Sequence, residues 1–256
     1  MTLGLRKLIL GLAFLSSATG LSGSPSFAGP APKPIDFVFD LDWTLFYVLP
    51  KDTLVDDRFT FRFDDEVYRL ADFVPEVLAD IESWPGARVS FFSGGTTERN
   101  EALLKMLRLP DGRSAWDIAY KVLNRPDLTK VSDNPALKFS KQNKKDLSKI
   151  NPNLGHVVIA DDTEEFVMPN QISNQLWLGA TYTFYSNEND LPRIATQYDP
   201  PSRAEWKKER LKILSVWEAF RQVYRNRDAA RPADFLPAKL PEVSSPCPIW
   251  LRSVTP

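Results

Sequence analysis

Residues 37–46 read FVFDLDWTLF, and the apolar run that opens this stretch ends at Asp40. Two other short apolar runs also end at polar residues: residues 89–92 at Ser93, and residues 157–160 at Asp161. Each run has a length typical of a buried strand, and segments rich in helix-forming residues lie between the runs. Strands that alternate with helices predict an α/β fold with a parallel sheet.

The remaining elements are predicted from the spacing of apolar residues. Alternation on either side of Asp64 and Asp65 predicts a small β-hairpin formed by residues 59–63 and 66–70. Helices are predicted over residues 74–81, 98–107, 141–150 and 203–227, and further strands over residues 119–123 and 182–185. We therefore expect a three-layer, Rossmann-like parallel sheet flanked by helices, with the hairpin inserted after the first strand and a long C-terminal helix.

The N-terminal residues have the pattern of a secretory signal peptide. Arg6 and Lys7 precede an apolar run at residues 8–15, and small residues lead to Ala28. A membrane anchor is the alternative, but the apolar run is well short of the ~20 residues that span a bilayer. We expect cleavage near Ala28, export as a secreted or periplasmic protein, and no stable membrane insertion afterwards. The expected organisation is then a signal peptide at 1–28, a leader at 29–34, one folded domain at 35–228 and a Pro-rich tail at 229–256.

Charge and cysteine content exclude several classes of function. The chain has 32 Lys and Arg against 33 Asp and Glu, and loss of Arg6 and Lys7 with the signal peptide leaves 30 − 33 = −3. This balance argues against a nucleic-acid partner or an anionic membrane surface. Cys247 is the one cysteine, so internal disulfides are excluded. The oligomeric state is left open.

The polar residues at the strand ends are expected to meet. In an open parallel sheet all carboxyl ends lie at one edge, where ligands bind. Carboxylates gathered there repel one another unless a cation neutralises them, and oxygen ligands without a cysteine or histidine cluster favour Mg²⁺. Ser93, Gly94 and Gly95 offer a hydroxyl and open backbone N–H groups to an anion where a strand turns into a helix. The sequence thus predicts a phosphate site beside a magnesium site.

Four motifs resemble the signatures of the haloacid dehalogenase superfamily of phosphohydrolases, in the right order. The first is the DLDWT of residues 40–44, the second is Ser93, the third is a lysine before the last strand, and the fourth is Asp161 with Asp162. The chain is similar in particular to the branch of RNA polymerase C-terminal-domain phosphatases and NLI-interacting-factor-like proteins. The Lys145-Asp146-Leu147 segment resembles the corresponding segment of that branch. Trp43, in contrast, occupies a position that is usually acidic there. The resemblance covers residues 35–179.

The resemblance implies a role for each matching residue. Asp40 would be the nucleophile that forms an aspartyl-phosphate, and Asp42 would protonate the leaving oxygen and then activate water. The phosphate would be held by Thr44, Ser93, Gly94 and Lys145, with Lys144 as the alternative lysine. The Mg²⁺ ligands would be Asp40, Asp42 through its backbone carbonyl, Asp161 and Asp162.

Three functions are consistent with these residues. The first is a phosphatase that acts on a phosphorylated small molecule or a phosphoprotein, and the sequence does not choose between these substrates. The second is a noncatalytic secreted binding module that retains the fold, against which stands the presence of every motif residue. The third is carbon–halogen hydrolysis, which Asp42 disfavours because dehalogenases of the superfamily lack that residue.

Overall fold

The computed structural model of the chain describes residues 33–49, 51, 59–179, 181–182, 200 and 202–243. The predicted signal peptide at 1–28, Cys247, and the predicted strand at 182–185 apart from Tyr182 lie outside these residues. Within the described part, no helix is both long enough and apolar enough to cross a membrane.

The predicted parallel sheet is confirmed and has five strands in the order β10-β9-β1-β5-β6. Their bounds are β1 Ile35–Phe39, β5 Ala87–Phe92, β6 Ala119–Leu123, β9 Val157–Asp161 and β10 Gln175–Trp177. The chain adds β5 and β6 on one side of β1 and then returns to the other side for β9 and β10. The strand order therefore reverses between β1 and β9, and such a reversal is where open α/β sheets bind ligands.

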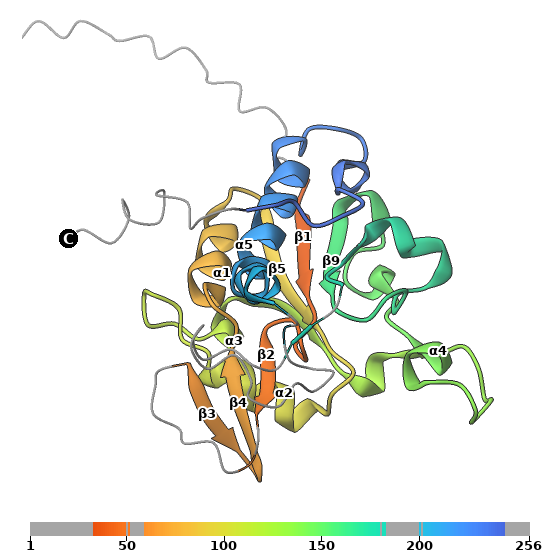
Figure 1. Cartoon of the computed structure of the whole chain (residues 1–256). Helices are drawn as coiled ribbons and strands as arrows, with labels where there is room; N and C mark the ends of the chain where they lie inside the picture. The colour runs from red at the N-terminus through yellow and green to blue at the C-terminus, as the bar shows by residue number, and fades with distance from the viewer. Residues whose placement is uncertain are drawn as a thin grey trace, which may run out of the picture. The chain divides into compact units, whose positions relative to one another are not determined.

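The two faces of the sheet are buried under different layers. On one face, Phe37 and Phe39 of β1 pack against Phe220, and their ring centroids lie 5.1 and 5.3 Å, respectively, from the ring centroid of Phe220. Phe220 belongs to α5 (Arg203–Arg225), which lies beside α1 (Val74–Ser83) over β1 and β5 (Figure 1). On the other face, Val38 packs with apolar side chains from residues 147–167. Alternate side chains of β1 thus serve two cores, as expected for a strand buried on both faces.

The predicted hairpin is confirmed as part of a second, antiparallel sheet of three strands, ordered β2-β4-β3. These strands are β2 Phe46–Leu49, β3 Thr60–Phe63 and β4 Glu66–Leu70, with Asp64 and Asp65 forming the turn. β2 was not predicted from the sequence, and its residues pair with β4 in place of continuing the loop after Asp40. Figure 1 shows this sheet beyond the end of β1 that leads to Asp40.

The predicted helix at residues 98–107 is observed as α2 (Thr97–Met106), directly after β5. Thr96 caps it, since the Thr96 side chain accepts a hydrogen bond from the Arg99 backbone N–H. The short helix α3 (Ala115–Ile118) leads into β6 and begins with a capping box formed by Ser114 and Asp117.

The predicted helix at residues 141–150 is wrong. That segment contains the end of α4 (Phe139–Gln142), the strand β8 (Asn143–Lys144), which pairs with β7 (Thr129–Lys130), and the 3-10 turn η2 (Leu147–Lys149). The backbone of Lys145 is extended because its N–H donates to Phe166 O and its C=O accepts from Met168 N. The Asp146 side chain then caps η2. Helical periodicity is present in the sequence, but these tertiary hydrogen bonds outweigh it.

The other short elements are 3-10 turns in the connecting segments. They are η1 (Arg125–Asp127), η3 (Leu154–His156), η4 (Pro169–Asn174) and η6 (Pro232–Phe235). η6 lies in the segment predicted as an irregular tail, and its Ala233 is buried in the core.

Candidate active site

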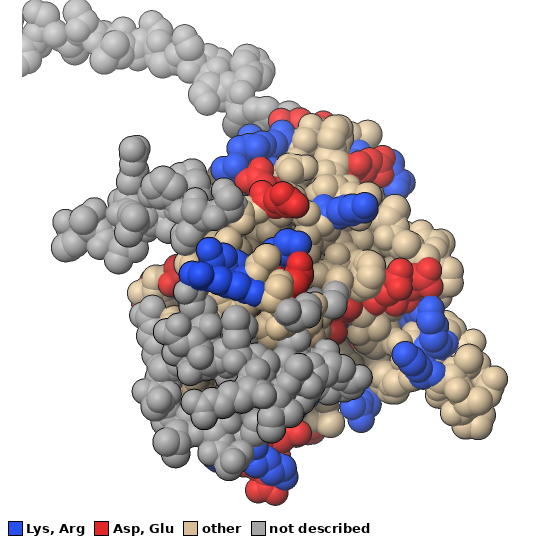
Figure 2. Space-filling model, in the orientation of Figure 1, with Lys and Arg blue, Asp and Glu red and all other residues tan. Residues whose placement is uncertain are grey.

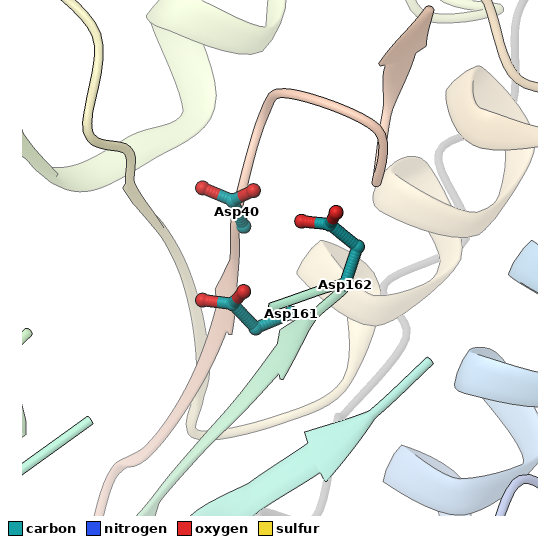
Figure 3. Close-up of side chains that lie close together, drawn as sticks. All are labelled: Asp40, Asp161 and Asp162. Atoms are coloured by element: carbon teal, nitrogen blue, oxygen red, sulfur yellow. The ribbon is translucent and has the colours of Figure 1, made fainter. Parts of the chain in front are cut away.

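Three carboxylates meet at the reversal point of the sheet. Asp40 directly follows β1, Asp161 is the last residue of β9, and Asp162 comes next. One oxygen from each of these three side chains lies within 4.8 Å of the other two (Figure 3). The carboxylates are adjacent because β1 and β9 are neighbouring parallel strands that end at the same edge.

Lys145 lies between two of these carboxylates. Its Nζ is 2.6 Å from Asp40 Oδ1 and 2.6 Å from Asp161 Oδ2, and its side chain is fully buried. The ring of Phe166 lies 4.8 Å from the ammonium, which adds a cation–π contact. Lys144 points elsewhere and donates to the backbone carbonyl of Glu165. Of the two lysines that the sequence left open, the structure therefore places Lys145 at the cluster.

The cluster has three carboxyl groups against the one ammonium group of Lys145. Burial raises the pKa of Asp40 and of Asp161, and the Lys145 ammonium opposes the rise at both. Burial and the neighbouring Asp161 raise the pKa of Asp162 to about 7. A further cation at this point would favour the ionised form of all three carboxylates.

The donor set fits a hard divalent cation such as Mg²⁺, because all three groups offer oxygen. Asp161 already accepts two hydrogen bonds, from Lys145 at Oδ2 and from the backbone N–H of Thr163 at Oδ1. Asp40 accepts a hydrogen bond from Lys145 at Oδ1, which leaves its Oδ2 as a possible metal ligand. Asp40 and Asp162 are thus the better placed ligands, and Asp161 orients Lys145 and the loop that follows β9.

Asp42 lies outside the group of three carboxylates. Its Oδ2 accepts hydrogen bonds from Arg99 Nη2 at 2.5 Å and from Ser93 Oγ at 3.2 Å. The Asp42 side chain is 28% exposed, whereas that of Asp40 is 6% exposed. The carboxylate of Asp42 therefore faces the start of α2 and is open to solvent, while its predicted backbone contact with a metal stays a prediction.

The predicted phosphate site lies between β5 and α2. The Ser93 hydroxyl accepts from the Gly95 N–H at 3.0 Å, which holds the turn into the helix. A Cβ at Gly94 would approach the ring of Phe139 to 3.3 Å, so the segment passes close to that side chain. The N-terminus of α2 adds a partial positive charge near this turn. The Ser93 side chain is buried and also donates to Asp42, and the binding roles of Ser93 and Gly94 stay predictions.

Thr44 lies in the tight loop between β1 and β2. It is fully buried, and its hydroxyl has no hydrogen-bond partner among the described residues. Leu45 and Phe46 both donate their backbone N–H to the carbonyl of Leu41, and Trp43 adopts a φ of 59°. A left-handed conformation at a bulky residue is costly and is found where surrounding contacts enforce it. The loop that contains Asp42 is therefore held in a defined, strained shape.

Two groups of residues were missed by sequence reasoning. Arg99 contacts Asp42, and the signal for it was an arginine in the first turn of the helix that follows Ser93. On α5, the buried Lys212 and Glu209 form an ion pair at 2.6 Å, and the Lys212 charge opposes the rise in the pKa of Asp162 that burial and Asp161 cause. Glu209 also accepts from the Tyr47 hydroxyl at 2.6 Å. The resemblance ended at residue 179, so it contained no signal for α5.

Comparison with known proteins identifies similar solved structures. No protein-family model and no curated protein matches the sequence. Two structures of the RNA polymerase II CTD phosphatase Fcp1 are similar to this chain. One is a fission yeast variant bound to beryllium fluoride, with a TM-score of 0.40 and 15% identity, covering 78% of this chain. The other is Fcp1 itself, with a TM-score of 0.39 and 15% identity, covering 79% of this chain.

This chain spans 57% of each Fcp1 chain.

Proposed function

We propose that this protein is an exported, Mg²⁺-dependent phosphomonoester hydrolase that works through an aspartyl-phosphate on Asp40. The supporting observation is the contact of Asp40 with the buried Lys145 at the point where the strand order reverses, within 4.8 Å of carboxylate oxygens of Asp161 and Asp162. Such a site combines a carboxylate nucleophile with fixed positive charge and oxygen ligands for a metal. Export is supported by the signal-peptide pattern of residues 1–28.

In the first step, an oxygen of Asp40 attacks phosphorus, and the bond from phosphorus to the leaving oxygen breaks. Asp42 gives its proton to that oxygen, so the alcohol departs neutral. In the second step, Asp42 takes a proton from water, and the hydroxide attacks the aspartyl-phosphate. Inorganic phosphate leaves, and the Asp40 carboxylate is restored.

The surrounding groups offset the repulsion between Asp40 and an anionic ester. Lys145 remains beside Asp40 and provides positive charge next to the transferring group. When bound, Mg²⁺ supplies further charge neutralisation and Lewis acidity at the transferring phosphoryl group. Asp40 and Asp162 are the residues that would hold the ion.

The substrate is a phosphorylated small molecule or a phosphoprotein. Asp42 is open to solvent, and a cavity of about 500 Å³ lies next to its partner Arg99. On the face of the molecule in Figure 2, acidic and basic side chains of the described residues are interspersed. On this face, such a distribution of charge does not favour a nucleic acid or an anionic membrane as partner.

Hydrolysis of an aryl phosphate by the mature protein tests this function. With Mg²⁺ we expect turnover, and with excess EDTA we expect at least a 10²-fold loss, because the metal offsets several kcal/mol of charge repulsion. Mg²⁺ should also raise the melting temperature, since an ion that binds the folded state stabilises it. The matched control is Asp162→Asn, in which the thermal shift should disappear. Turnover that EDTA leaves unchanged would contradict the proposal, and so would inactivity on small-molecule and phosphopeptide substrates alike.

A further inference from the structure

Arg99 makes the shortest contact to Asp42. Its Nη2 donates to Asp42 Oδ2 at 2.5 Å, and the two side chains are 21% and 28% exposed. Ser93 Oγ also donates to Asp42 Oδ2 at 3.2 Å. The orientation of the Asp42 carboxylate is therefore determined by a cation on α2 and a hydroxyl at the end of β5.

The guanidinium of Arg99 is itself fixed by its neighbours. Its Nη2 and Nε donate to Asn100 Oδ1 at 3.0 and 3.3 Å, and the buried Asn100 donates in turn to Asn124 at 2.8 Å. The space for the guanidinium exists because residue 95 is glycine. A Cβ at Gly95 would lie 2.0 Å from Arg99 Nη2 and 2.6 Å from Asn100 Oδ1. This network holds Arg99 in place before any substrate arrives.

Arg99 also lines the cavity of about 500 Å³ between the start of α2 and the hairpin of β3 and β4. Tyr68 of β4, Phe63 of β3 and Glu98 of α2 line the same cavity. Arg99, the partner of Asp42, lines this cavity, whereas Lys145 does not. A leaving group that receives its proton from Asp42 would lie near Arg99, toward this cavity.

We propose that Arg99 is a positioning residue for Asp42: it aims the Asp42 carboxyl group at the leaving oxygen. This inference rests on the proposed function. The contact of 2.5 Å with Arg99 Nη2 at Oδ2 fixes the direction in which Asp42 presents its carboxyl group to the leaving oxygen. The rate enhancement from this positioning arises in the transition state of the first step. It is larger for an ester whose leaving oxygen needs a proton to depart.

The test compares two esters on each protein preparation. Ethyl phosphate has a poor leaving group that needs a proton, whereas dinitrophenyl phosphate releases a stable anion. The measured quantity is kcat/KM. It reports only the steps up to and including departure of the alcohol, so the later attack of water does not affect it. For Arg99→Ala we expect kcat/KM to fall about 10²-fold with ethyl phosphate and less than about threefold with dinitrophenyl phosphate. Arg99→Lys, which keeps a cation, should recover part of the loss with ethyl phosphate.

The ratio of the two losses does not depend on the fraction of protein that is folded, because both esters meet the same preparation. Arg113→Ala is the control, since Arg113 forms exposed ion pairs with Glu82 and Asp111 away from the site, and it should leave both values unchanged. In an Asp42→Asn background, Arg99→Ala should cause no further loss with ethyl phosphate, as expected for two residues that act as one unit.

Equal losses with both esters would overturn the inference and leave the proposed phosphatase function intact. Full additivity of Arg99→Ala with Asp42→Asn would also overturn it. If the wild-type protein hydrolyses neither ester nor any phosphopeptide, the proposed function fails, and the inference fails with it.

Discussion

Replacement of Asp40 by asparagine is expected to lower kcat for phosphate ester hydrolysis by at least about 10³-fold, because an amide cannot form the acyl phosphate on which the proposed route depends. Asparagine has nearly the same shape, and Lys145 keeps its contact of 2.6 Å with Asp161. The backbone N–H of residue 40 also keeps its hydrogen bond to the carbonyl of Ala160. The fold is therefore expected to persist, and the loss should appear in kcat at saturating substrate.

Asp111→Asn is the matched control for this prediction. Asp111 is an aspartate in an exposed ion pair with Arg113, so the same change of group should leave kcat unaltered there. Retention of the far-ultraviolet circular dichroism spectrum by Asp40→Asn should accompany its inactivity. Turnover by Asp40→Asn at the wild-type rate would remove Asp40 from the role of nucleophile.

Replacement of Lys145 by methionine should weaken both the fold and the reaction. The side chain is fully buried between Asp40 and Asp161, so its loss leaves two buried carboxylates without their cation. Removing one partner from a buried ion pair costs about 3–5 kcal/mol, and we expect a decrease of this size in the free energy of unfolding in urea with EDTA present. Loss of the fixed charge beside the transferring phosphoryl group should lower kcat by about 10²–10³-fold.

The neighbouring residue provides the control for Lys145. Lys144→Met removes a lysine that donates to the carbonyl of Glu165, and it should cost only about 1 kcal/mol, with kcat unchanged. Equal effects of the two substitutions on stability and on kcat would contradict the special position given to Lys145.

The fold was predictable where apolar patterning and burial agree. The three apolar runs became β1, β5 and β9, and the hairpin and α1, α2 and α5 lie where helical or alternating spacing places them. The helix predicted at residues 141–150 was wrong for a different reason. That segment has helical spacing, but Lys145 is extended because its backbone pairs with the strand-like segment around Val167. Pairing between segments about 20 residues apart leaves no local signal in a sequence.

The candidate site was predictable to the extent that strand ends must converge. Parallel pairing of β1 with β9 brings Asp40 to Asp161 and Asp162 without further assumption. The direction of each side chain was not predictable from the sequence. Asp42 points to Arg99, and Lys212 approaches Asp162 from α5. These contacts depend on how α2 and α5 pack on the sheet, which spacing along the chain does not specify. The catalytic and binding roles of the site residues stay predictions.

The most direct test of the account is to trap the phosphorylated enzyme. Asp42→Asn lacks the base that activates water, so incubation with Mg²⁺ and dinitrophenyl phosphate should leave the first step possible and slow the second. After an acid quench and proteolysis, mass spectrometry should find one phosphoryl group on the peptide that contains Asp40, and none in an Asp40→Asn, Asp42→Asn double variant. Phosphoryl transfer to Ser93 or another side chain, or wild-type turnover without any label on Asp40 in the trapping variant, would contradict the account.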